Sequence, residues 1–283
     1  MLPRFVNTSF FFNICDHKFP LSLPTENGQL LFVHADHLED FVENAMSNIH
    51  VKYCIVSGMS DHTIPYHFPK ESSAIELNPN VLFWFSVNCL EPTQKRKQIP
   101  IGLNYPLDQS ILPPFTTPFE KEEEQEILEV QDQVCLQRKN LCYGNFHFSM
   151  ITLYAQDRRD ALQQIPADLI HYESRRLSRK ETLQNMKEYK FVVSPFGNGY
   201  DCYRTWEALI LGCIPIIKSS GLDPMFAGLP VMIVDSWTEV TRERLDSFIA
   251  DTSQIEKITM RFWVEYINTT KMNCLNSANN DSL

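Results

Sequence analysis

The chain has 283 residues, of which 43% are hydrophobic and 21% are charged, and a formal net charge of -10 at pH 7. This is an ordinary globular composition that can form a large core without disulfides or metals. The acidic balance argues against a general nucleic-acid binder, because phosphate contacts need clustered Lys and Arg. The longest apolar run, residues 208–217, is too short to span a bilayer, and we identify no signal peptide.

The first half of the chain has the pattern of alternating strands and helices. Residues 30–33 and 53–56 are short apolar runs typical of buried strands, and residues 36–49 between them have apolar side chains at helical spacing. This βαβ unit implies parallel strands, and residues 81–87 add an aromatic-rich strand. We predict that residues 1–135 form one Rossmann-like domain.

A proline-rich segment, residues 104–120, and a charged helix over residues 120–134 lead into a second half of similar kind. The remaining elements are predicted from periodicity and capping signals. They are strands at 141–146 and 231–234, helices at 156–165 and 180–189, a helix at 238–249 that starts with a Ser236/Glu239 capping box, a last helix at 253–267 and a disordered tail at 271–283. The fold class is therefore α/β, with a second domain at 136–270 and two Rossmann-like domains facing across a cleft. Ligands of such sheets bind beyond the carboxyl ends of the strands.

The most informative stretch is residues 189–218. It combines a buried strand at 191–193, a turn-forming loop, a helix at 202–211 that stops at Gly212, and a second strand at 214–217. Asp201 is the expected N-cap of the helix. A strand, a glycine loop and a helix in this order place an anion at a helix N-terminus.

Arg204 and Glu207 lie three residues apart and share a face of this helix. Arg204 can grip a diphosphate with its planar fork, and Glu207 can accept hydrogen bonds from sugar hydroxyls. The alternative is a surface ion pair between the two. Asp201 would repel a phosphate at the same helix end, so it must cap the helix or bind a sugar hydroxyl. The loop lacks the GK[ST] of a P-loop and the third glycine of a dinucleotide-binding loop.

The eight cysteines contain no CxxC pair, so we expect no zinc site, and Cys54, Cys202 and Cys213 have apolar neighbours typical of small core residues. Reduced cysteines indicate a cytoplasmic protein; the alternative is a soluble lumenal form, which the sequons at Asn7, Asn268 and Asn280 favour weakly.

The run SPFGNGYDCYRTWEALILGCIPII, residues 194–217, resembles the C-terminal signature of exostosin-like glycosyltransferases, and LPVMIVDSW at 229–237 extends the likeness more thinly. The resemblance implies a GT-B fold, a nucleotide-sugar donor in the C-terminal domain and no bound metal. Arg204 and Glu207 match the signature directly. Phe196 stands where many members have Arg or Lys, which removes one possible phosphate contact.

In the first half, VSGMSDHTIP at 56–65, WFSVN at 84–88 and KQIPIGLNYP at 97–106 also resemble exostosin-like and related proteins in their order. Asp61 and His62 follow a strand, so they are expected at its carboxyl end, where a carboxylate or imidazole can take the proton of an acceptor hydroxyl. Asp61 is the first candidate base, His62 the second and Asp36 the third; Asp61 can equally cap a turn. Asn88 binds a sugar hydroxyl or only ends its strand.

These interpretations predict a glycosyltransferase that moves a sugar from a nucleotide sugar, UDP- or GDP-linked, to a glycan or other hydroxyl acceptor, inverting and without a metal or other cofactor. The alternative is a non-catalytic module that binds nucleotide sugars or glycans on the same fold. No nucleic acid and no integral membrane segment are expected. The expected donor-binding residues are Ser194, Gly197, Asn198, Gly199, Asp201, Arg204, Glu207, His147 and Arg158.

Overall fold

The computed structural model describes residues 2–103, 121–135, 137–148, 152 and 154–280. The chain forms two compact units, which are Met1–Ile101 with Thr259–Leu283 (unit 1) and Gly102–Ile258 (unit 2). These limits differ from the predicted domains in two places: residues 102–135 belong to unit 2, and the last helix packs into unit 1 rather than ending unit 2. The predicted proline-rich connection at 104–120 lies outside the described residues.

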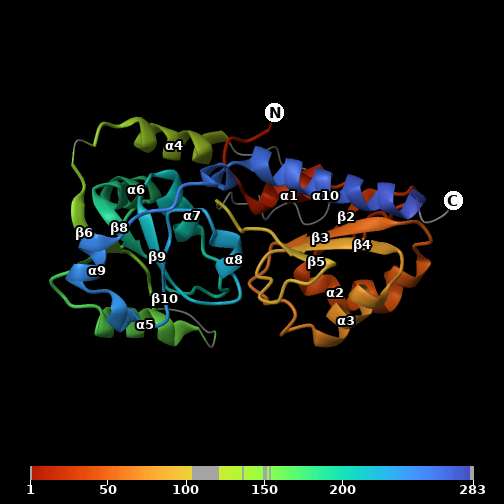
Figure 1. Ribbon diagram of the computed structural model, residues 1–283, viewed down its shortest axis with the longest axis horizontal. Coiled ribbons are helices and arrows are strands. Elements are labelled where there is room, and N and C mark those ends of the chain that lie inside the picture. Colours follow the sequence, from red (N-terminus) through yellow and green to blue (C-terminus); the bar gives the residue numbers. More distant parts are fainter. Residues whose placement is uncertain (1, 104–120, 136, 149–151, 153, 281–283) are drawn as a thin grey trace. The chain divides into compact units, whose positions relative to one another are not determined.

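Unit 1 contains a parallel sheet whose strands follow one another in chain order (Figure 1). The strands are β1 (His17–Lys18), β2 (Gln29–His34), β3 (Tyr53–Gly58), β4 (Val81–Ser86) and β5 (Arg96–Gln98). The strands predicted at 30–33, 53–56 and 81–87 are confirmed. β1 and β5 were not predicted, since two or three residues are too short to show a period.

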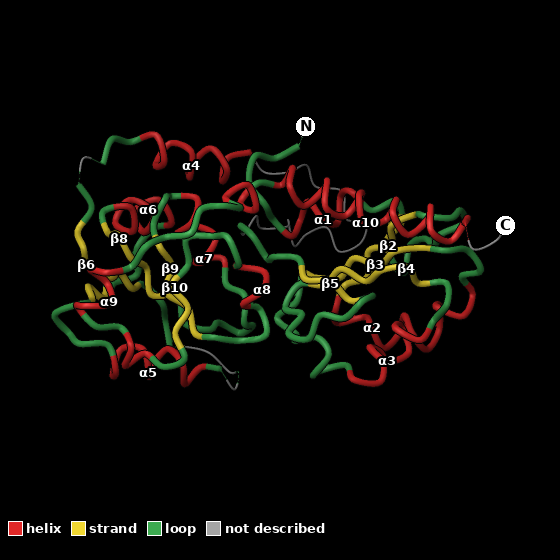
Figure 2. The backbone as a smooth tube through the Cα atoms, viewed as in Figure 1, coloured by secondary structure: helices red, strands yellow, loops and turns green. Residues whose placement is uncertain are grey.

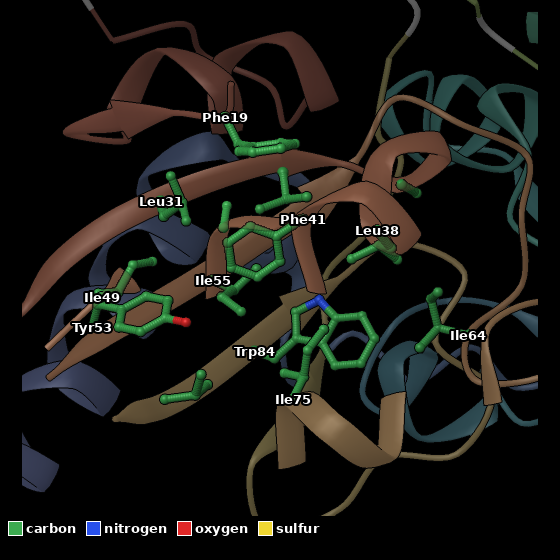
Figure 3. Close-up of a cluster of buried hydrophobic side chains, with 14 residues drawn as sticks. Phe19, Leu31, Leu38, Phe41, Ile49, Tyr53, Ile55, Ile64, Ile75 and Trp84 are labelled. Carbon is green, nitrogen blue, oxygen red and sulfur yellow. The ribbon is translucent and has the colours of Figure 1, made fainter. Parts of the chain in front are cut away.

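Helical segments cover both faces of this sheet (Figure 2). They are α1 (Thr8–Ile14), α2 (Leu38–Asp40), α3 (Pro69–Leu77) and α10 (Met260–Asn280), with η1 (Ala35–His37), η2 (Phe41–Ala45) and η3 (Met46–Asn48). The helix predicted at 36–49 is present but irregular, because η1 and η3 are 3₁₀ turns and η2 is a π-helical turn. Leu38 and Phe41 from this segment pack against Ile55 and Trp84 of the sheet in one buried cluster (Figure 3).

The C-terminal helix α10 corrects two predictions. It begins at Met260, after a 3₁₀ turn η5 (Ile255–Ile258), and it continues to Asn280, so the tail from residue 271 to 280 is helical rather than disordered. Trp263 and Ile267 are buried four residues apart, and the ring of Tyr266 lies 5.9 Å from that of Phe85 in β4. This apolar stripe packs the first half of α10 onto the sheet of unit 1.

Unit 2 contains a second parallel sheet with the strand order β10-β9-β8-β6-β7. The strands are β6 (Lys139–Gly144), β7 (Ile170–Tyr172), β8 (Tyr189–Val193), β9 (Ile214–Lys218) and β10 (Met232–Val234). The chain goes from β6 outward to β7 and then returns to the other side of β6 at β8. The carboxyl ends of β6 and β8 therefore form a topological switch point, where open α/β sheets bind ligands.

The helices of unit 2 are α4 (Lys121–Asp132), α5 (Ala155–Gln164), α6 (Arg179–Lys187), α7 (Tyr203–Ile210), α8 (Asp223–Phe226) and α9 (Arg242–Ser247). The single helix predicted at 238–249 is wrong, since this stretch forms a 3₁₀ turn η4 (Trp237–Glu239) and then α9. The Ser236/Glu239 capping box is confirmed, and it caps η4.

All eight cysteines are free thiols, and Cys54, Cys202 and Cys213 are buried as predicted. In the described part of the chain, no helix combines the length and the apolar character that a membrane crossing needs.

Candidate functional site

The glycine loop joins β8 to α7 at the switch point of unit 2. The N-cap of α7 is Cys202, so the prediction that Asp201 caps this helix is wrong. Asp201 is instead buried and accepts a hydrogen bond of 2.9 Å from Trp206 Nε1. Gly212 has φ +73° just after the helix, which confirms it as the stop signal.

Arg204 directs its side chain toward this loop rather than to bulk solvent. Its Nη1 atom lies 3.5 Å from both Ser194 Oγ and Pro195 O, and its guanidinium lies over the ring of Phe146 at 5.4 Å. Among the described residues Arg204 forms no ion pair with a carboxylate. Its charge is half-buried and has only neutral contacts.

Arg158 reaches the same loop from α5 and is only 6% exposed. Its Nε donates to Phe196 O at 3.1 Å and its Nη1 donates to His147 O at 2.6 Å. No carboxylate of the described chain forms an ion pair with it. Burial, followed by repulsion from Arg204, lowers the pKa of Arg158 to about 10. A buried cation with only carbonyl partners is a poor structural element and a good anion-binding group.

The close packing of Cys202 and Arg158 around Gly197 leaves little room for a side chain at this position. A Cβ atom at this position would lie 3.1 Å from Cys202 Sγ and 3.4 Å from Arg158 Nη2. Its φ is not positive, so a close approach, rather than an unusual turn, requires the glycine.

His147 follows β6 and is exposed at the same site. Burial lowers the pKa of its imidazole, and Arg158, Arg204 and Arg176 lower it further in that order. His147 is therefore held neutral beside three guanidinium groups. Arg176 was not predicted, because it follows the three-residue strand β7, which has no sequence signal, and stands among other basic residues.

Glu207 does not pair with Arg204, so the alternative of an ion pair between them is not what the structure shows. Its Oε1 lies 3.5 Å from Arg179 Nε, and Arg179 Nη1 lies 2.8 Å from Glu126 Oε2. The Glu207 side chain is 15% exposed, and burial raises the pKa of its carboxyl group against the opposing effect of Arg179 and Arg204.

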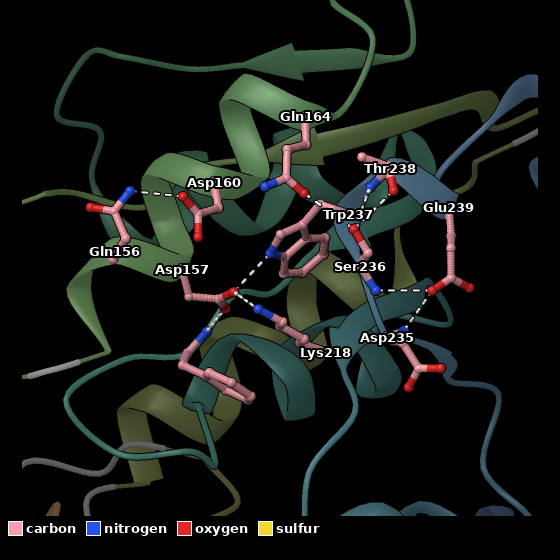
Figure 4. A network of polar contacts seen from close by, with 11 residues as sticks. Gln156, Asp157, Asp160, Gln164, Lys218, Asp235, Ser236, Trp237, Thr238 and Glu239 are labelled. Carbon is pink, nitrogen blue, oxygen red and sulfur yellow. Dashed lines mark hydrogen bonds and ion pairs between the residues drawn. The ribbon is translucent and has the colours of Figure 1, made fainter.

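Two amides of the glycine loop have hydrogen-bond acceptors within the protein. Gly197 N–H donates to Gly199 O at 3.0 Å. Phe196 N–H donates to Asp157 Oδ2 at 2.9 Å, while Asn198 is exposed. Asp157, drawn in Figure 4, was not predicted, since a single acidic residue in the first turn of a helix is common.

In unit 1, the carboxyl ends of β2 and β3 bring together a second polar cluster. Asp36 Oδ1 lies 3.5 Å from His62 Nε2 and accepts a hydrogen bond from Ser60 Oγ, and Asp36 Oδ2 lies 3.8 Å from His34 Nδ1. Asp61 is exposed and forms no polar contact within the described part of the chain. The third candidate base, Asp36, thus contacts the second, His62, whereas the first is isolated.

Two further polar residues of unit 1, His34 and Asn88, are affected by burial. Burial lowers the pKa of His34, against the attraction of Asp36 and with help from His37 and His62. Asn88 is 1% exposed, with φ 51°, and its carbonyl accepts from Ile64 N–H at 3.0 Å. Its burial favours the alternative that it ends its strand.

In the ranges that the structure describes, no three His, Cys, Asp or Glu side chains are grouped as metal ligands would be.

No family model matches this chain, and no curated protein sequence matches it. Several solved structures resemble it in fold. The UDP-forming α,α-trehalose-phosphate synthase of Burkholderia vietnamiensis is 9% identical with a TM-score of 0.42, covering 90% of this chain and 75% of the synthase. HepE of Anabaena, in complex with UDP-glucose, is 13% identical with a TM-score of 0.39, covering 89% of this chain and 78% of HepE. The α/β class with two parallel sheets is evident from the structure of the chain itself.

Proposed function

We propose that this protein is a glycosyltransferase of the exostosin-like, GT-B type that transfers a sugar from a UDP- or GDP-sugar to a hydroxyl acceptor. The proposal rests on Arg158 and Arg204, two guanidinium groups at the switch point of unit 2. Arg158 is buried and Arg204 is half-buried. Neither forms an ion pair with a carboxylate of the described chain. Such a pair is stabilised by a ligand that carries at least two negative charges, as a nucleotide diphosphate does.

The chemistry that suits these residues is charge stabilisation on the leaving group. When the bond between the sugar and the diphosphate breaks, negative charge develops on the diphosphate oxygens. Arg204 and Arg158 neutralise this charge, and the neutral His147 adds a hydrogen bond. The proposal assigns this role to side chains and involves no metal.

Glu207 is proposed to accept hydrogen bonds from hydroxyl groups of the donor. Its contact with Arg179 fixes one carboxylate oxygen and leaves the other for the ligand. Asp201 has no such role in this proposal, because its carboxylate is buried and already accepts from Trp206.

For the acceptor, we propose that the base is the imidazole of His62 oriented by Asp36, rather than Asp61. An imidazole beside a carboxylate can take the hydroxyl proton while the carboxylate stabilises the resulting cation. The contact of 3.5 Å supports this pairing. The proposed outcome of the transfer is inversion of the sugar configuration.

A non-catalytic module that binds nucleotide sugars is the second candidate. The isolation of Asp61, the residue first expected to be the base, favours it. The two candidates differ in turnover and not in donor binding.

The test is a screen of UDP- and GDP-sugars for thermal stabilisation, followed by a transfer assay with the sugars that bind. A ligand that binds only the folded state raises the Tm. Stabilisation with transfer supports the transferase, and stabilisation without hydrolysis or transfer to any hydroxyl acceptor supports the binding module. If no nucleotide sugar stabilises the protein, both candidates are wrong.

A further inference from the structure

Two consecutive residues of α5 hold the backbone N–H and C=O groups of one residue in the glycine loop, Phe196. Asp157 Oδ2 accepts a hydrogen bond of 2.9 Å from Phe196 N–H, and Arg158 Nε donates one of 3.1 Å to Phe196 O. Both polar groups of residue 196 are thus occupied by side chains from one helix turn. Phe196 is the residue that departs from the exostosin-like signature. At this position the backbone, rather than a basic side chain, makes the polar contacts.

The Asp157 carboxylate is itself anchored to distant parts of unit 2. It is 6% exposed, and its Oδ1 accepts a hydrogen bond of 2.8 Å from Trp237 Nε1 and lies 3.5 Å from Lys218 Nζ. Figure 4 shows Trp237 and Lys218 directed at Asp157 from η4 and the end of β9. Since Trp237 is fully buried, the carboxylate has little freedom to move.

The position of this loop also determines where the two cations lie. Arg158 contacts Phe196 O, and Arg204 contacts Pro195 O in the preceding peptide unit. A shift of residues 195–196 would therefore change the separation of two guanidinium groups that must grip the same anion.

We propose that Asp157 is a positioning residue for the anion site of unit 2. Its carboxylate holds residues 195–196 in place before any ligand arrives, so that Arg158 and Arg204 are arranged in advance for a diphosphate. This inference rests on the proposed function, since it takes the anion to be the diphosphate of the donor. Asp157 does not touch the ligand in this account, and Lys218 balances its charge.

Only a carboxylate can do this with both oxygens. Asparagine has nearly the same shape, but its single oxygen can accept from Phe196 N–H or from Trp237 Nε1, and its NH₂ group accepts from neither. The Asp157→Asn variant therefore leaves one donor unpaired without creating a cavity.

The experiment compares the parent with Asp157→Asn, with Trp237→Phe and with the control Asp160→Asn, whose side chain on the same helix contacts Gln156. Hydrogen exchange at the Phe196 amide is measured without ligand. Affinity for UDP and for inorganic pyrophosphate is measured by calorimetry, well below the unfolding temperature.

We expect Asp157→Asn to accelerate exchange at Phe196 and to weaken binding of both anions about tenfold or more. Trp237→Phe loses a buried hydrogen bond to the same carboxylate but keeps the Phe196 bond, so its Tm falls while its affinity stays within about threefold of the parent. Asp160→Asn changes neither. A role in stability alone would lower the Tm of Asp157→Asn and leave its affinity intact, which would overturn the proposal.

Two outcomes separate this inference from the proposed function. If the parent binds pyrophosphate and Asp157→Asn does not, but no nucleotide sugar is turned over or bound, the positioning role stands and the transferase is wrong. If Asp157→Asn does not fold, exchange in the parent decides, because the inference requires a protected Phe196 amide without ligand. An unprotected amide there would overturn it.

Discussion

Arg158 and Arg204 reach neighbouring peptide units of one loop from two different helices. Arg158 donates to Phe196 O at 3.1 Å and Arg204 Nη1 lies 3.5 Å from Pro195 O, and Arg204 is one of the causes that lower the pKa of Arg158 to about 10. Two like charges at this proximity destabilise the unliganded protein. Binding of an anion relieves the repulsion between the two guanidinium groups. The free energy that the repulsion costs the unliganded protein is then regained on binding and raises the affinity for the ligand.

The imidazole of His147 should titrate below the ordinary histidine pKa of about 6.5. Burial and the neighbouring arginines lower its pKa, so it is neutral at pH 7. NMR of the His147 ring protons during a pH titration measures this value. Addition of UDP should raise it, since a bound anion favours the imidazolium, and Arg204→Gln should raise it as well. An unshifted midpoint in the parent would show that His147 lies apart from the cations.

Acid should destabilise unit 1 partly through His34. The folded state holds the pKa of His34 below its usual value, so the unfolded state binds the proton more readily. Protonation of His34 therefore does not reduce the free energy of unfolding above pH 6.5. The free energy of unfolding falls as the pH drops through that value, and the loss is complete below the pKa of His34 in the folded state. Urea unfolding at pH 7.5 and 5.5 should show a smaller acid loss for His34→Gln than for the parent. The exposed His50 provides the control, and an equal loss in His50→Gln and His34→Gln would contradict the assignment.

Turnover should depend on His62 and Asp36 more than on Asp61. His62→Gln and Asp36→Asn remove the imidazole base and the carboxylate that orients it, so kcat should fall by about 10²–10⁴-fold. Asp61→Asn should stay within about threefold of the parent, because Asp61 is exposed and contacts no polar group of the described chain. All three variants should retain donor affinity. A collapse of kcat in Asp61→Asn alone would return the base to Asp61.

The sequence predicted the central part of unit 2 well, because its signals are local. The buried strand at 191–193, the helix stop at Gly212 and the strand at 214–217 each depend on neighbouring residues, and all are confirmed. The prediction that Asp201 is a cap failed because Trp206, one turn along the same helix, competes for its carboxylate. Capping preference is weaker than a buried hydrogen bond of this kind.

The rest of the site depends on contacts between residues far apart in the chain. Asp157 reaches Phe196 and Trp237 across 39 and 80 residues, and no local pattern marks such partners. The packing of α10 onto unit 1 likewise depends on a contact between distant residues, the rings of Tyr266 and Phe85, which no local sequence pattern marks.

The most direct test of the account is nucleotide affinity of Arg204→Gln against Arg159→Gln, measured by calorimetry with UDP and GDP. Arg159 adjoins Arg158 on α5, but its side chain is exposed, so it controls for the loss of one positive charge from the same unit. We expect Arg204→Gln to weaken binding at least tenfold with an unchanged or higher Tm, and Arg159→Gln to bind like the parent. Equal affinity in the two variants would contradict an anion site at Arg204.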